Sequence, residues 1–384
     1  MRILAVSHSA ILDVNRPLWM ELARREHHVR LVVPSRWKND YGTQPLRPEP
    51  LLDDAGGRLS LRVGRAAMTG HTAFQCYAPA VIARMAVWRP NVIFIDEEPW
   101  SLATLQWAAL AALLDCPLAV WTMENRQRRY PWPFSLFNAF VLRRAGWIAA
   151  ISDASMEVFR AQGYRGIVSV APKVVDTGLF FPVPGDHKAD EPRIGFVGRI
   201  APEKGVETAL DAMALLDGVR VPTLHVYGAG DATYLEELRQ RQRRLCLGPD
   251  RVVWHGPVAH QEAPEAMRSL DLLVVPTVSH HGYKEQFGRV VIEALACKVP
   301  VLTSDNGELP VLVTRTGGGF IAPEGQPQAL AEGITAALAD RTALAQRAEE
   351  GYHYVLRHYT YGTLAEEVEG VLRRIVRDAA ATHA

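Results

Sequence analysis

The sequence lacks several features that mark other classes of protein. Its 384 residues include only four cysteines, which are far apart and show no metal-type spacing. Basic and acidic residues balance at 42 each, so no net charge attracts the chain to nucleic acid. No apolar run is long enough to span a membrane. The longest, residues 102–120, contains Gln106 and Asp115 and is interpreted as a buried helix followed by a strand.

The N-terminal residues are not expected to form a leader segment. A short apolar run, Ile3–Val6, ends at polar Ser7 and His8, which is too short for a signal peptide. Together with the few scattered cysteines, this predicts a cytoplasmic protein. The hydrophobic fraction of 48% and charged fraction of 22% are ordinary for a globular protein. The length allows two domains, each with its own core.

Apolar, β-branched runs alternate with helical stretches along the chain. In the first half, strands are predicted at residues 2–7, 28–34, 92–95 and 118–121. This alternation is typical of an open parallel α/β sheet, in which ligands bind at the carboxyl ends of the strands. A second series starts at Arg193, after a Pro-, Gly- and charge-rich linker.

The loops after the first strands carry polar side chains that can meet hydroxyl groups of a ligand. His8 follows the first strand, and Asp96, Glu97 and Glu98 follow a later one. An alternative for these carboxylates is that one or two of them only cap a helix beginning near Pro99.

The second half contains a stretch with two glutamates, Glu285–Glu293, between an apolar strand and a run of good helix formers. Gly288 lets a ligand approach the start of the helix, where unpaired N–H groups and the helix dipole favour phosphate. Carboxylates on both sides of an anion site suit a nucleotide-sugar, with sugar hydroxyls at Glu285 and ribose hydroxyls at Glu293. The pair alone also fits a solvated loop residue and an ordinary helix-surface charge.

A basic loop precedes this stretch. Residues 194–198 predict a strand that ends in Gly198, and Arg199 and Lys204 follow it. Two fixed cations at the end of a strand stabilise a diphosphate leaving group as its negative charge builds up. Gly228 ends the next predicted strand in the same way.

The residues from Pro276 to Pro300 resemble the Glu-x7-Glu signature of the family 4 retaining glycosyltransferases, which have the GT-B fold. The family text is close to Glu-Pro-Phe-Gly-Leu-Val-x-x-Glu-Ala, and here Gln286 replaces Pro and Arg289 replaces Leu. Arg289 either adds a charge beside the phosphates or points to solvent. The loop at 198–205 resembles the family's Gly-Arg-x-x-x-x-Lys-Gly, and the resemblance is strongest from about residue 151 onward.

The resemblance implies two Rossmann-like domains whose parallel sheets face a central cleft. The acceptor-binding domain is expected at residues 1–172, joined by a C-terminal helix at about 358–384. A linker at 173–192 leads to the nucleotide-sugar-binding domain at 193–357.

The implied activity is transfer of a sugar from a nucleoside diphosphate to a hydroxyl, with retention, in glycan, polysaccharide or glycolipid biosynthesis. The catalytic residues implied are Arg199, Lys204 and Glu285. The donor-binding residues implied are Gly198, Gly228, Phe287, Gly288, Arg289 and Glu293. No cofactor and no metal are expected, because two cations and a helix N-terminus take the place of a divalent ion.

The acceptor side departs from the family pattern. His8 lies where the family usually has a Gly-Gly loop, and the histidine usual after a middle strand is missing. Glu124 occupies that place, either as its substitute or as a loop carboxylate paired with Arg126 or Arg128. His8, Asp96, Glu97 and Glu124 are therefore the acceptor-side candidates. Two rival functions stay open: a nucleotide-sugar epimerase of the same fold, and a catalytically inactive nucleotide-sugar-binding subunit of a partner enzyme.

Residues 126–144 hold five arginines and five aromatic residues without an acidic one. One interpretation is a basic loop followed by a helix whose Leu136, Phe137, Phe140 and Val141 face the core. The other is a patch that binds the inner face of a membrane, near a lipid-linked acceptor. A loop that holds an anionic soluble acceptor is equally consistent with this composition.

Overall fold

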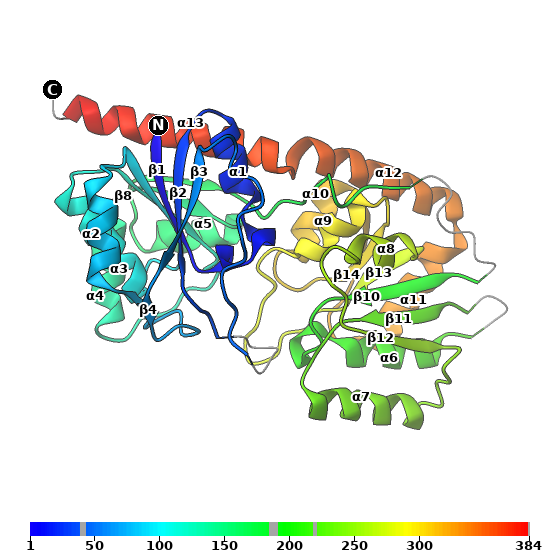
Figure 1. Cartoon of the computed structure of the whole chain (residues 1–384). Coiled ribbons are helices and arrows are strands. Elements are labelled where there is room, and N and C mark those ends of the chain that lie inside the picture. Colours follow the sequence, from blue (N-terminus) through cyan, green and yellow to red (C-terminus); the bar gives the residue numbers. More distant parts are fainter. Residues whose placement is uncertain (39–43, 184–190, 218–220, 383–384) are drawn as a thin grey trace. The chain divides into compact units, whose positions relative to one another are not determined.

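The computed structural model describes residues 1–38, 44–183, 191–217 and 221–382. The chain divides into two compact units, drawn in Figure 1. Unit 1 comprises Met1–Pro172 and Tyr361–Ala384, and unit 2 comprises Lys173–Thr360. The segment 173–192, which the sequence suggests is a linker, falls within unit 2, and its residues 184–190 lie outside the described residues.

Unit 1 is built on a parallel sheet, which in the described residues has the strand order β3-β2-β1-β6-β7-β8-β9. The strands are β1 (Arg2–Ser7), β2 (His28–Pro34), β3 (Leu59–Gly64), β6 (Val92–Asp96), β7 (Leu118–Thr122), β8 (Ala145–Ala150) and β9 (Ile167–Val170). A separate antiparallel pair consists of β4 (Ala66–Ala67) and β5 (Cys76–Tyr77). The central strands β6 and β7 are buried along their whole length, as their continuous apolar runs predict.

The helices of unit 1 are α1 (Pro17–Arg24), α2 (Pro79–Val87), α3 (Leu102–Leu113), α4 (Phe134–Arg144), α5 (Asp153–Ala161) and α13 (Tyr361–Thr382), with the 3-10 turns η1 (Ser9–Ile11) and η2 (Asp13–Asn15). The C-terminal helix α13 belongs to this unit, and α1 packs on it. Glu369 on α13 accepts a hydrogen bond from Arg25 at 3.3 Å and lies 3.1 Å from Nε2 of His27.

Two local predictions about these helices are wrong. The helix expected to begin near Pro99 begins at Leu102, because the Ser101 hydroxyl caps it by accepting from the Thr104 N–H at 3.1 Å. On α4, Val141 is buried as predicted. Leu136 lies on the outward side of this helix and is 58% exposed.

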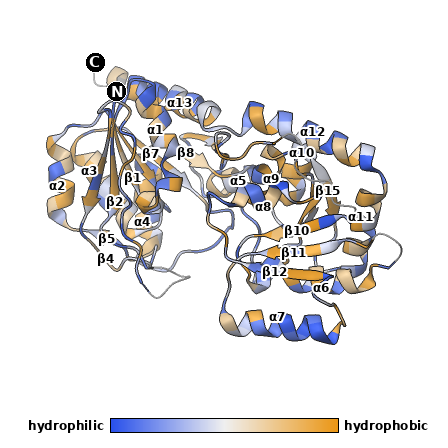
Figure 2. Cartoon of the chain, turned by 45° about the vertical axis from the view of Figure 1, so that its right-hand side comes forward, coloured by the Kyte–Doolittle hydropathy of each residue, from blue (hydrophilic) through white to orange (hydrophobic). Residues whose placement is uncertain are grey.

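Unit 2 contains a second parallel sheet, with the order β12-β11-β10-β13-β14-β15 in the described residues. Its strands are β10 (Arg193–Val197), β11 (Thr223–Tyr227), β12 (Val252–Gly256), β13 (Leu272–Val275), β14 (Val301–Ser304) and β15 (Gly319–Ala322). Its helices are α6 (Val206–Leu215), α7 (Ala232–Arg244), α8 (Ala263–Arg268), α9 (Arg289–Ala296), α10 (Leu309–Thr316), α11 (Pro327–Ala339) and α12 (Arg341–His358), with the 3-10 turn η3 (Pro202–Lys204). Figure 2 shows largely apolar strands and the strongly hydrophilic outer helix α7.

The strand orders determine where ligands can bind. In unit 1 the strand β1 lies between β2 and β6, and in unit 2 the strand β10 lies between β11 and β13. At such a reversal of winding, the loops after the two central strands diverge and leave room for a ligand at their carboxyl ends. The fold therefore predicts ligand-binding sites at the loops after β1 and β6, and at those after β10 and β13.

Candidate active site

In unit 2, the loops after β10 and β11 pack against each other through their backbones. The Gly198 N–H donates to the Tyr227 carbonyl at 3.0 Å. A Cβ on Gly228 would lie 1.9 Å from the carbonyl oxygen of Gly198, so only glycine fits at Gly228. The two predicted donor-binding glycines thus lie side by side, and packing alone already requires one of them.

The basic loop brings Lys204 to Glu285. The Lys204 Nζ lies 2.6 Å from Oε2 of Glu285 and donates to the Tyr283 hydroxyl at 2.8 Å. Burial lowers the pKa of Lys204, but the Glu285 carboxylate and the Tyr283 hydroxyl outweigh it, so this pKa is raised and the ammonium keeps its charge. Arg199 makes an ion pair with Glu203, and its side chain is partly exposed.

The position of Lys204 is fixed by the glycine that follows it. Gly205 has a φ of +70°, and a Cβ there would lie 1.8 Å from the carbonyl oxygen of Pro276. The Val278 N–H donates to the Glu203 carbonyl at 2.9 Å. The loop after β10 is therefore held against the loop after β13, and no side chain larger than glycine is tolerated at Gly205.

Glu285 is supported from a third loop, which follows β14. The Glu285 N–H donates to Oδ1 of the buried Asn306 at 2.8 Å, and the Glu308 N–H donates to the Glu285 carbonyl at 3.1 Å. The Asn306 Nδ2 donates to the Glu324 carboxylate at 2.5 Å. Both backbone groups of Glu285 are thus satisfied, and its side chain is left to meet Lys204.

The helix α9 begins directly after Gly288. Gly288 has a φ of +88°, and a Cβ there would lie 2.6 Å from the Leu309 side chain. Phe287 is buried against Tyr359, with ring centroids 5.7 Å apart, so it presents only its backbone to a ligand. Within the described residues no side-chain hydrogen bond caps α9. Its first N–H groups have no partner within the helix and can receive an anion.

Arg289 and Glu293 form an ion pair one turn apart on α9. The Arg289 Nε donates to Oε1 of Glu293 at 2.7 Å. The Glu293 side chain is only 12% exposed. Burial raises the pKa of Glu293, and the Arg289 guanidinium opposes this rise. Arg289 therefore does not simply point to solvent, because it neutralises the carboxylate expected to hold ribose.

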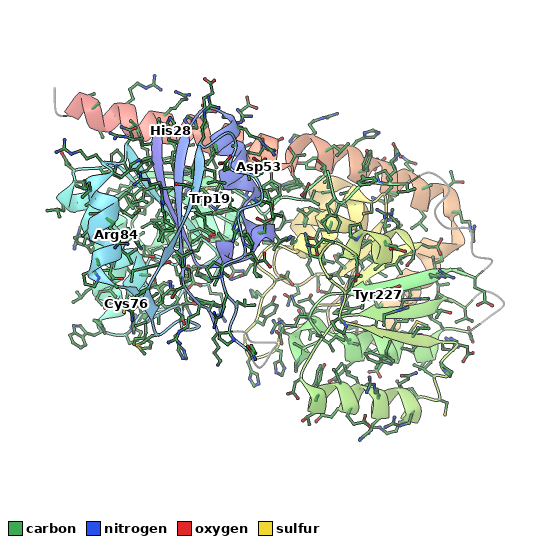
Figure 3. The ribbon with its side chains drawn as sticks, in the orientation of Figure 1. Trp19, His28, Asp53, Cys76, Arg84 and Tyr227 are labelled. Atoms are coloured by element: carbon green, nitrogen blue, oxygen red, sulfur yellow. The ribbon has the colours of Figure 1, made fainter. Side chains whose placement is uncertain are left out.

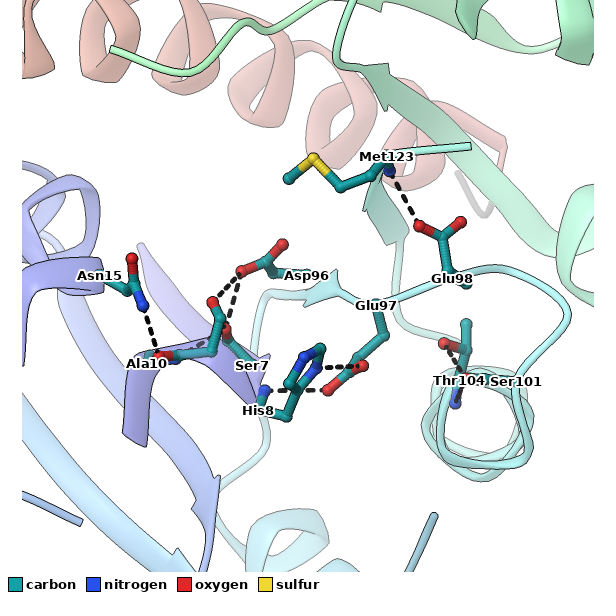
Figure 4. A network of polar contacts seen from close by, with 11 residues as sticks. Ser7, His8, Ala10, Asn15, Asp96, Glu97, Glu98, Ser101, Thr104 and Met123 are labelled. Atoms are coloured by element: carbon teal, nitrogen blue, oxygen red, sulfur yellow. Dashed lines mark hydrogen bonds and ion pairs between the residues drawn. The ribbon is translucent and has the colours of Figure 1, made fainter. Parts of the chain in front are cut away.

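In unit 1, polar groups from the loops after β1 and β6 are joined in the network of Figure 4. The Ser7 hydroxyl donates to Oδ2 of Asp96 at 2.7 Å. The His8 N–H donates to Oε1 of Glu97 at 2.9 Å, and the His8 Nδ1 lies 2.6 Å from the second oxygen of the same carboxylate. Burial lowers the pKa of His8, but Glu97 outweighs it and this pKa is raised. His8 also stacks on Trp37, with centroids 4.2 Å apart.

Glu98, the next residue, bonds to the loop after β7. The Thr122 hydroxyl donates to it at 2.5 Å and the Met123 N–H at 3.0 Å. Burial raises the pKa of Glu98 to about 7, and the nearby Glu124 adds to this rise. A carboxyl group that titrates near neutrality therefore lies among the acceptor-side candidates.

Glu124 is almost fully buried and paired. Arg128 makes an ion pair with its Oε2, and the Tyr130 hydroxyl donates to the same oxygen at 3.2 Å. The Arg126 backbone N–H donates to Oε1 at 3.2 Å. The Arg128 guanidinium lies 4.9 Å from the centroid of the Trp100 ring, so it is held by a cation–π contact as well. The structure therefore shows the pairing of Glu124 with Arg128, and a role of Glu124 in place of the usual histidine stays a prediction.

Sequence reasoning missed two residues that complete the unit 2 site. Tyr283 binds Lys204 and lies two positions before Glu285, a spacing that places two side chains on one side of an extended segment. This signal was available in the sequence. Asn306 carries no such signal, because it follows a different strand and meets Glu285 only through the adjacency of β13 and β14.

Two features are absent from the residues that the structure describes. Among them, no group of three or more His, Cys, Asp or Glu side chains is arranged to hold a metal ion. In the same part of the chain, no helix is both long and apolar enough to cross a membrane.

Comparison with known families gives two matches that follow each other along the chain. The model described as "Glycosyl transferase 4-like domain" matches residues 14–172, and the model described as "Glycosyl transferases group 1" matches residues 181–354. The limits of these matches follow the two structural units.

Individual relatives have low sequence identity to this chain. The D-inositol 3-phosphate glycosyltransferase of Jonesia denitrificans is 30% identical over 226 residues, which are 54% of this chain and 51% of the relative. The 2-deoxystreptamine glucosyltransferase of Streptomyces kanamyceticus is 27% identical over 305 residues, 73% of this chain and 77% of the relative. The chain spans about half the length of the first of these.

Solved structures agree over the whole fold. HepE of Anabaena in complex with UDP superposes with a TM-score of 0.77 at 21% identity, covering 97% of this chain and 100% of the other. Sucrose-phosphate synthase of Thermosynechococcus elongatus gives 0.73 at 20% identity, covering 98% and 100%. The predicted GT-B class is confirmed, and with both family models matched in order, the chain belongs to the family 4 glycosyltransferases of the GT-B fold.

Proposed function

We propose that this protein transfers a sugar from a nucleoside diphosphate to a hydroxyl acceptor, with retention at the anomeric carbon. The observation that carries the proposal is the contact between Lys204 and Glu285, 2.6 Å apart, from the loops after β10 and β13. These strands are adjacent in the sheet and flank its reversal of winding. A cation and a carboxylate fixed there suit a diphosphate and the hydroxyls of its sugar.

Each donor-side residue has a role that follows from its chemistry. Lys204 and Arg199 stabilise the leaving diphosphate, together with the N-terminus of α9 after Gly288. Glu285 accepts hydrogen bonds from sugar hydroxyls, and Glu293 accepts them from ribose. Gly198 and Gly228 have no side chains, so the nucleotide can approach the backbone closely. The backbone of Phe287 contributes to the phosphate site.

The reaction breaks the bond between the anomeric carbon and the diphosphate oxygen, and forms one to the acceptor oxygen on the same face. The acceptor's proton passes to the departing phosphate, so no separate protein base is needed. The charge on that phosphate is balanced by the two cations and the helix, which is why we propose that the reaction needs no metal.

Unit 1 supplies the acceptor groups in this proposal. The carboxylates of Asp96 and Glu97 can accept hydrogen bonds from hydroxyl groups of the sugar acceptor. His8, held against Glu97, can donate one. Glu124 contributes through its pair with Arg128. The names of two relatives specify D-inositol 3-phosphate and 2-deoxystreptamine, both rings with several hydroxyls, and compounds of this kind are the first acceptors to test.

We further propose a cytoplasmic enzyme that touches the membrane surface through residues 126–144. The four cysteines are free, which suits a reducing compartment. Trp132 is 78% exposed and Leu136 58% exposed, and Arg129 is exposed in the same segment. Exposed aromatic, aliphatic and basic side chains together favour the headgroup region of an anionic bilayer.

A thermal-shift screen against nucleoside diphosphates and their sugars tests the donor site. UDP and UDP-glucose come first, because solved GT-B relatives hold them. A ligand at 100 times its dissociation constant adds about 2.7 kcal/mol to the free energy of unfolding. Product formation by the purified chain then separates an enzyme from an inactive binding subunit. Absence of a shift with every nucleotide would contradict the proposed donor site.

A further inference from the structure

We propose that unit 1 carries a binding groove for a phosphate ester with free hydroxyls, beside the acceptor-side residue Glu124. The groove lies between α4 and the loop that joins α5 to β9, and its volume is about 760 Å³. It is called the α4 groove below, and its lining residues are Arg128, Tyr130, Ser135, Asn138, Ala139, Leu142, Arg143, Ala145 and the loop Gln162–Gly166.

One face of α4 forms a wall of the groove. The lining positions 135, 138, 139, 142 and 143 recur at intervals of three and four, which places them on one side of a helix. Ser135 and Ala139 are small, so the middle of the wall stays open. The opposite wall is the loop at 162–166, in which Gly163 has a φ of +79° and no heavy atom within 4 Å of the place of a Cβ.

The charge of the groove is one-sided. Arg128, Arg143 and Arg165 line it, and none of its lining residues is acidic, although basic and acidic residues are equal in number in the chain. Arg143 and Arg165 are exposed, and among the described residues neither has an ion-pair partner. The planar guanidinium fork matches the oxygens of a phosphate, so the ligand is expected to be an anion of this kind.

Two amide side chains indicate that the ligand also has hydroxyls. Asn138 is only 8% exposed, and its Nδ2 donates to Oε1 of Gln162 at 2.8 Å. Oδ1 of Asn138 and Nε2 of Gln162 are buried without a hydrogen-bond partner among the described residues. If both amides were turned round, one acceptor and one donor would still be unmet. These two atoms are closed to solvent, so a ligand hydroxyl, which both donates and accepts, satisfies the pair only when the amides turn toward the groove.

Arg128 connects the groove to the acceptor-side residues. It lines the groove and also makes the ion pair with Glu124. An anion bound in the groove competes with Glu124 for this guanidinium. That consequence rests on the acceptor role proposed for Glu124, whereas the groove as a binding site does not.

The binding test uses glycerol 1-phosphate as the soluble probe and phosphatidylglycerol vesicles as the membrane probe, with phosphatidylcholine vesicles for comparison. The groove variant is Arg143→Gln with Arg165→Gln. The matched control is Arg62→Gln with Arg84→Gln, which removes two exposed arginines of the same unit (Arg84 is labelled on α2 in Figure 3). Calorimetric titration of the full chain is expected to show binding that weakens at least about tenfold in the groove variant and stays unchanged in the control.

A second variant, Ser135→Asp, protects the test against misfolding. It puts a negative charge into the groove within the first turn of α4, where the helix dipole favours an acidic residue. We expect loss of probe binding with an unchanged or higher melting temperature. UDP binding, measured on the same variants, should stay at the wild-type level, so failure of the donor site is seen separately.

The outcomes are distinct. Binding of glycerol 1-phosphate that both groove variants weaken supports a soluble phosphate ester. Binding of phosphatidylglycerol vesicles alone, weakened by the same variants, supports a lipid headgroup. Equal binding by wild type, groove variants and control, or no binding of either probe, would overturn the proposal.

Discussion

Arg289 donates a hydrogen bond to Glu293 across one turn of α9, at 2.7 Å, with the cation at the N-terminal side of the carboxylate. This order is the less favourable one for a helix, because the positive end of the dipole lies next to the cation. Helix stability therefore does not explain the pair. The guanidinium instead adds positive charge at the place where the proposed site receives phosphates, and it leaves Oε2 of Glu293 for ribose.

Replacement of Arg289 by leucine, the residue usual in the family, should weaken nucleoside diphosphate binding about tenfold, the size of one charge-assisted contact. It should also change the pH dependence. Burial raises the pKa of Glu293 and Arg289 opposes the rise, so without Arg289 the carboxylate protonates at higher pH. The pH below which UDP binding declines should therefore move upward in the Arg289→Leu variant.

The measurement is a series of UDP titrations by calorimetry between pH 5 and pH 8. A suitable control is Arg239→Leu, the same change at an exposed position of α7. Lysine at position 289 should restore much of the wild-type profile, because it keeps the charge. A wild-type affinity and pH profile in Arg289→Leu would show that Glu293 does not depend on this partner.

The buried carboxyl group of Glu98 makes the stability of unit 1 depend on pH. Its pKa is raised from 4.5 to about 7 by burial. Between these values the folded state binds a proton that the unfolded chain has released, so the stabilisation is complete below about pH 4.5 and declines as pH rises toward 7. Glu98→Gln keeps the shape and removes the titration.

Thermal unfolding at a series of pH values between 4.5 and 8 measures this effect. The melting temperature of the wild type should fall more steeply across this range than that of Glu98→Gln. Glu157→Gln, at an exposed position of α5, should follow the wild type. Parallel curves for wild type and Glu98→Gln would mean that Glu98 does not titrate in this range.

Much of the fold can be predicted from local sequence patterns. The limits of β1 and β2 agree with the predicted strands at 2–7 and 28–34, because buried parallel strands are continuous apolar runs. The start of α3 was predicted wrongly, since three acidic residues before Pro99 suggested a cap that Ser101 provides. Leu136 was assigned to the core from helical spacing, and the side of α4 that is buried depends on neighbours distant in sequence.

The candidate site, like the fold, could be predicted only in part. Lys204 and Glu285 stood out because each belongs to a motif whose spacing is visible along the chain. Asn306, which holds the backbone of Glu285, and Trp37, which stacks on His8, are brought in by strand order and loop packing. Such partners have no fixed distance in sequence, so a single sequence cannot reveal them.

Sugar transfer should continue after exhaustive treatment with a chelator. In the proposed site, the charge of the leaving diphosphate is met by Lys204, Arg199 and the N-terminus of α9. The rate with EDTA should remain within about twofold of the untreated rate, and added magnesium should not raise it further. A strict requirement for magnesium or manganese would contradict this part of the mechanism.

Vesicle co-sedimentation tests the membrane contact. Wild-type protein should pellet with vesicles that contain phosphatidylglycerol, and less so at high salt, because the Debye length falls to about 3 Å at 1 M. Arg126→Gln with Arg129→Gln and Trp132→Ala should reduce the pelleted fraction several-fold, at about 1 kcal/mol for each arginine. Arg62→Gln with Arg84→Gln again controls for net charge. Equal recovery of wild type and the first variant would rule out this surface.

The proposed function depends on the donor site built on Lys204. The rate of nucleoside diphosphate release from the sugar nucleotide that the screen selects is the direct test of this site. This rate counts both transfer and slow hydrolysis of the donor, so it does not depend on knowing the acceptor. Lys204→Ala and Glu293→Ala should each lower it by roughly 10²–10³-fold with the fold intact by circular dichroism. Lys284→Ala, an exposed lysine of the same loop as Glu285, should keep the wild-type rate. Folded Lys204→Ala and Glu293→Ala proteins that release the diphosphate at the wild-type rate would contradict the assignment of the donor site.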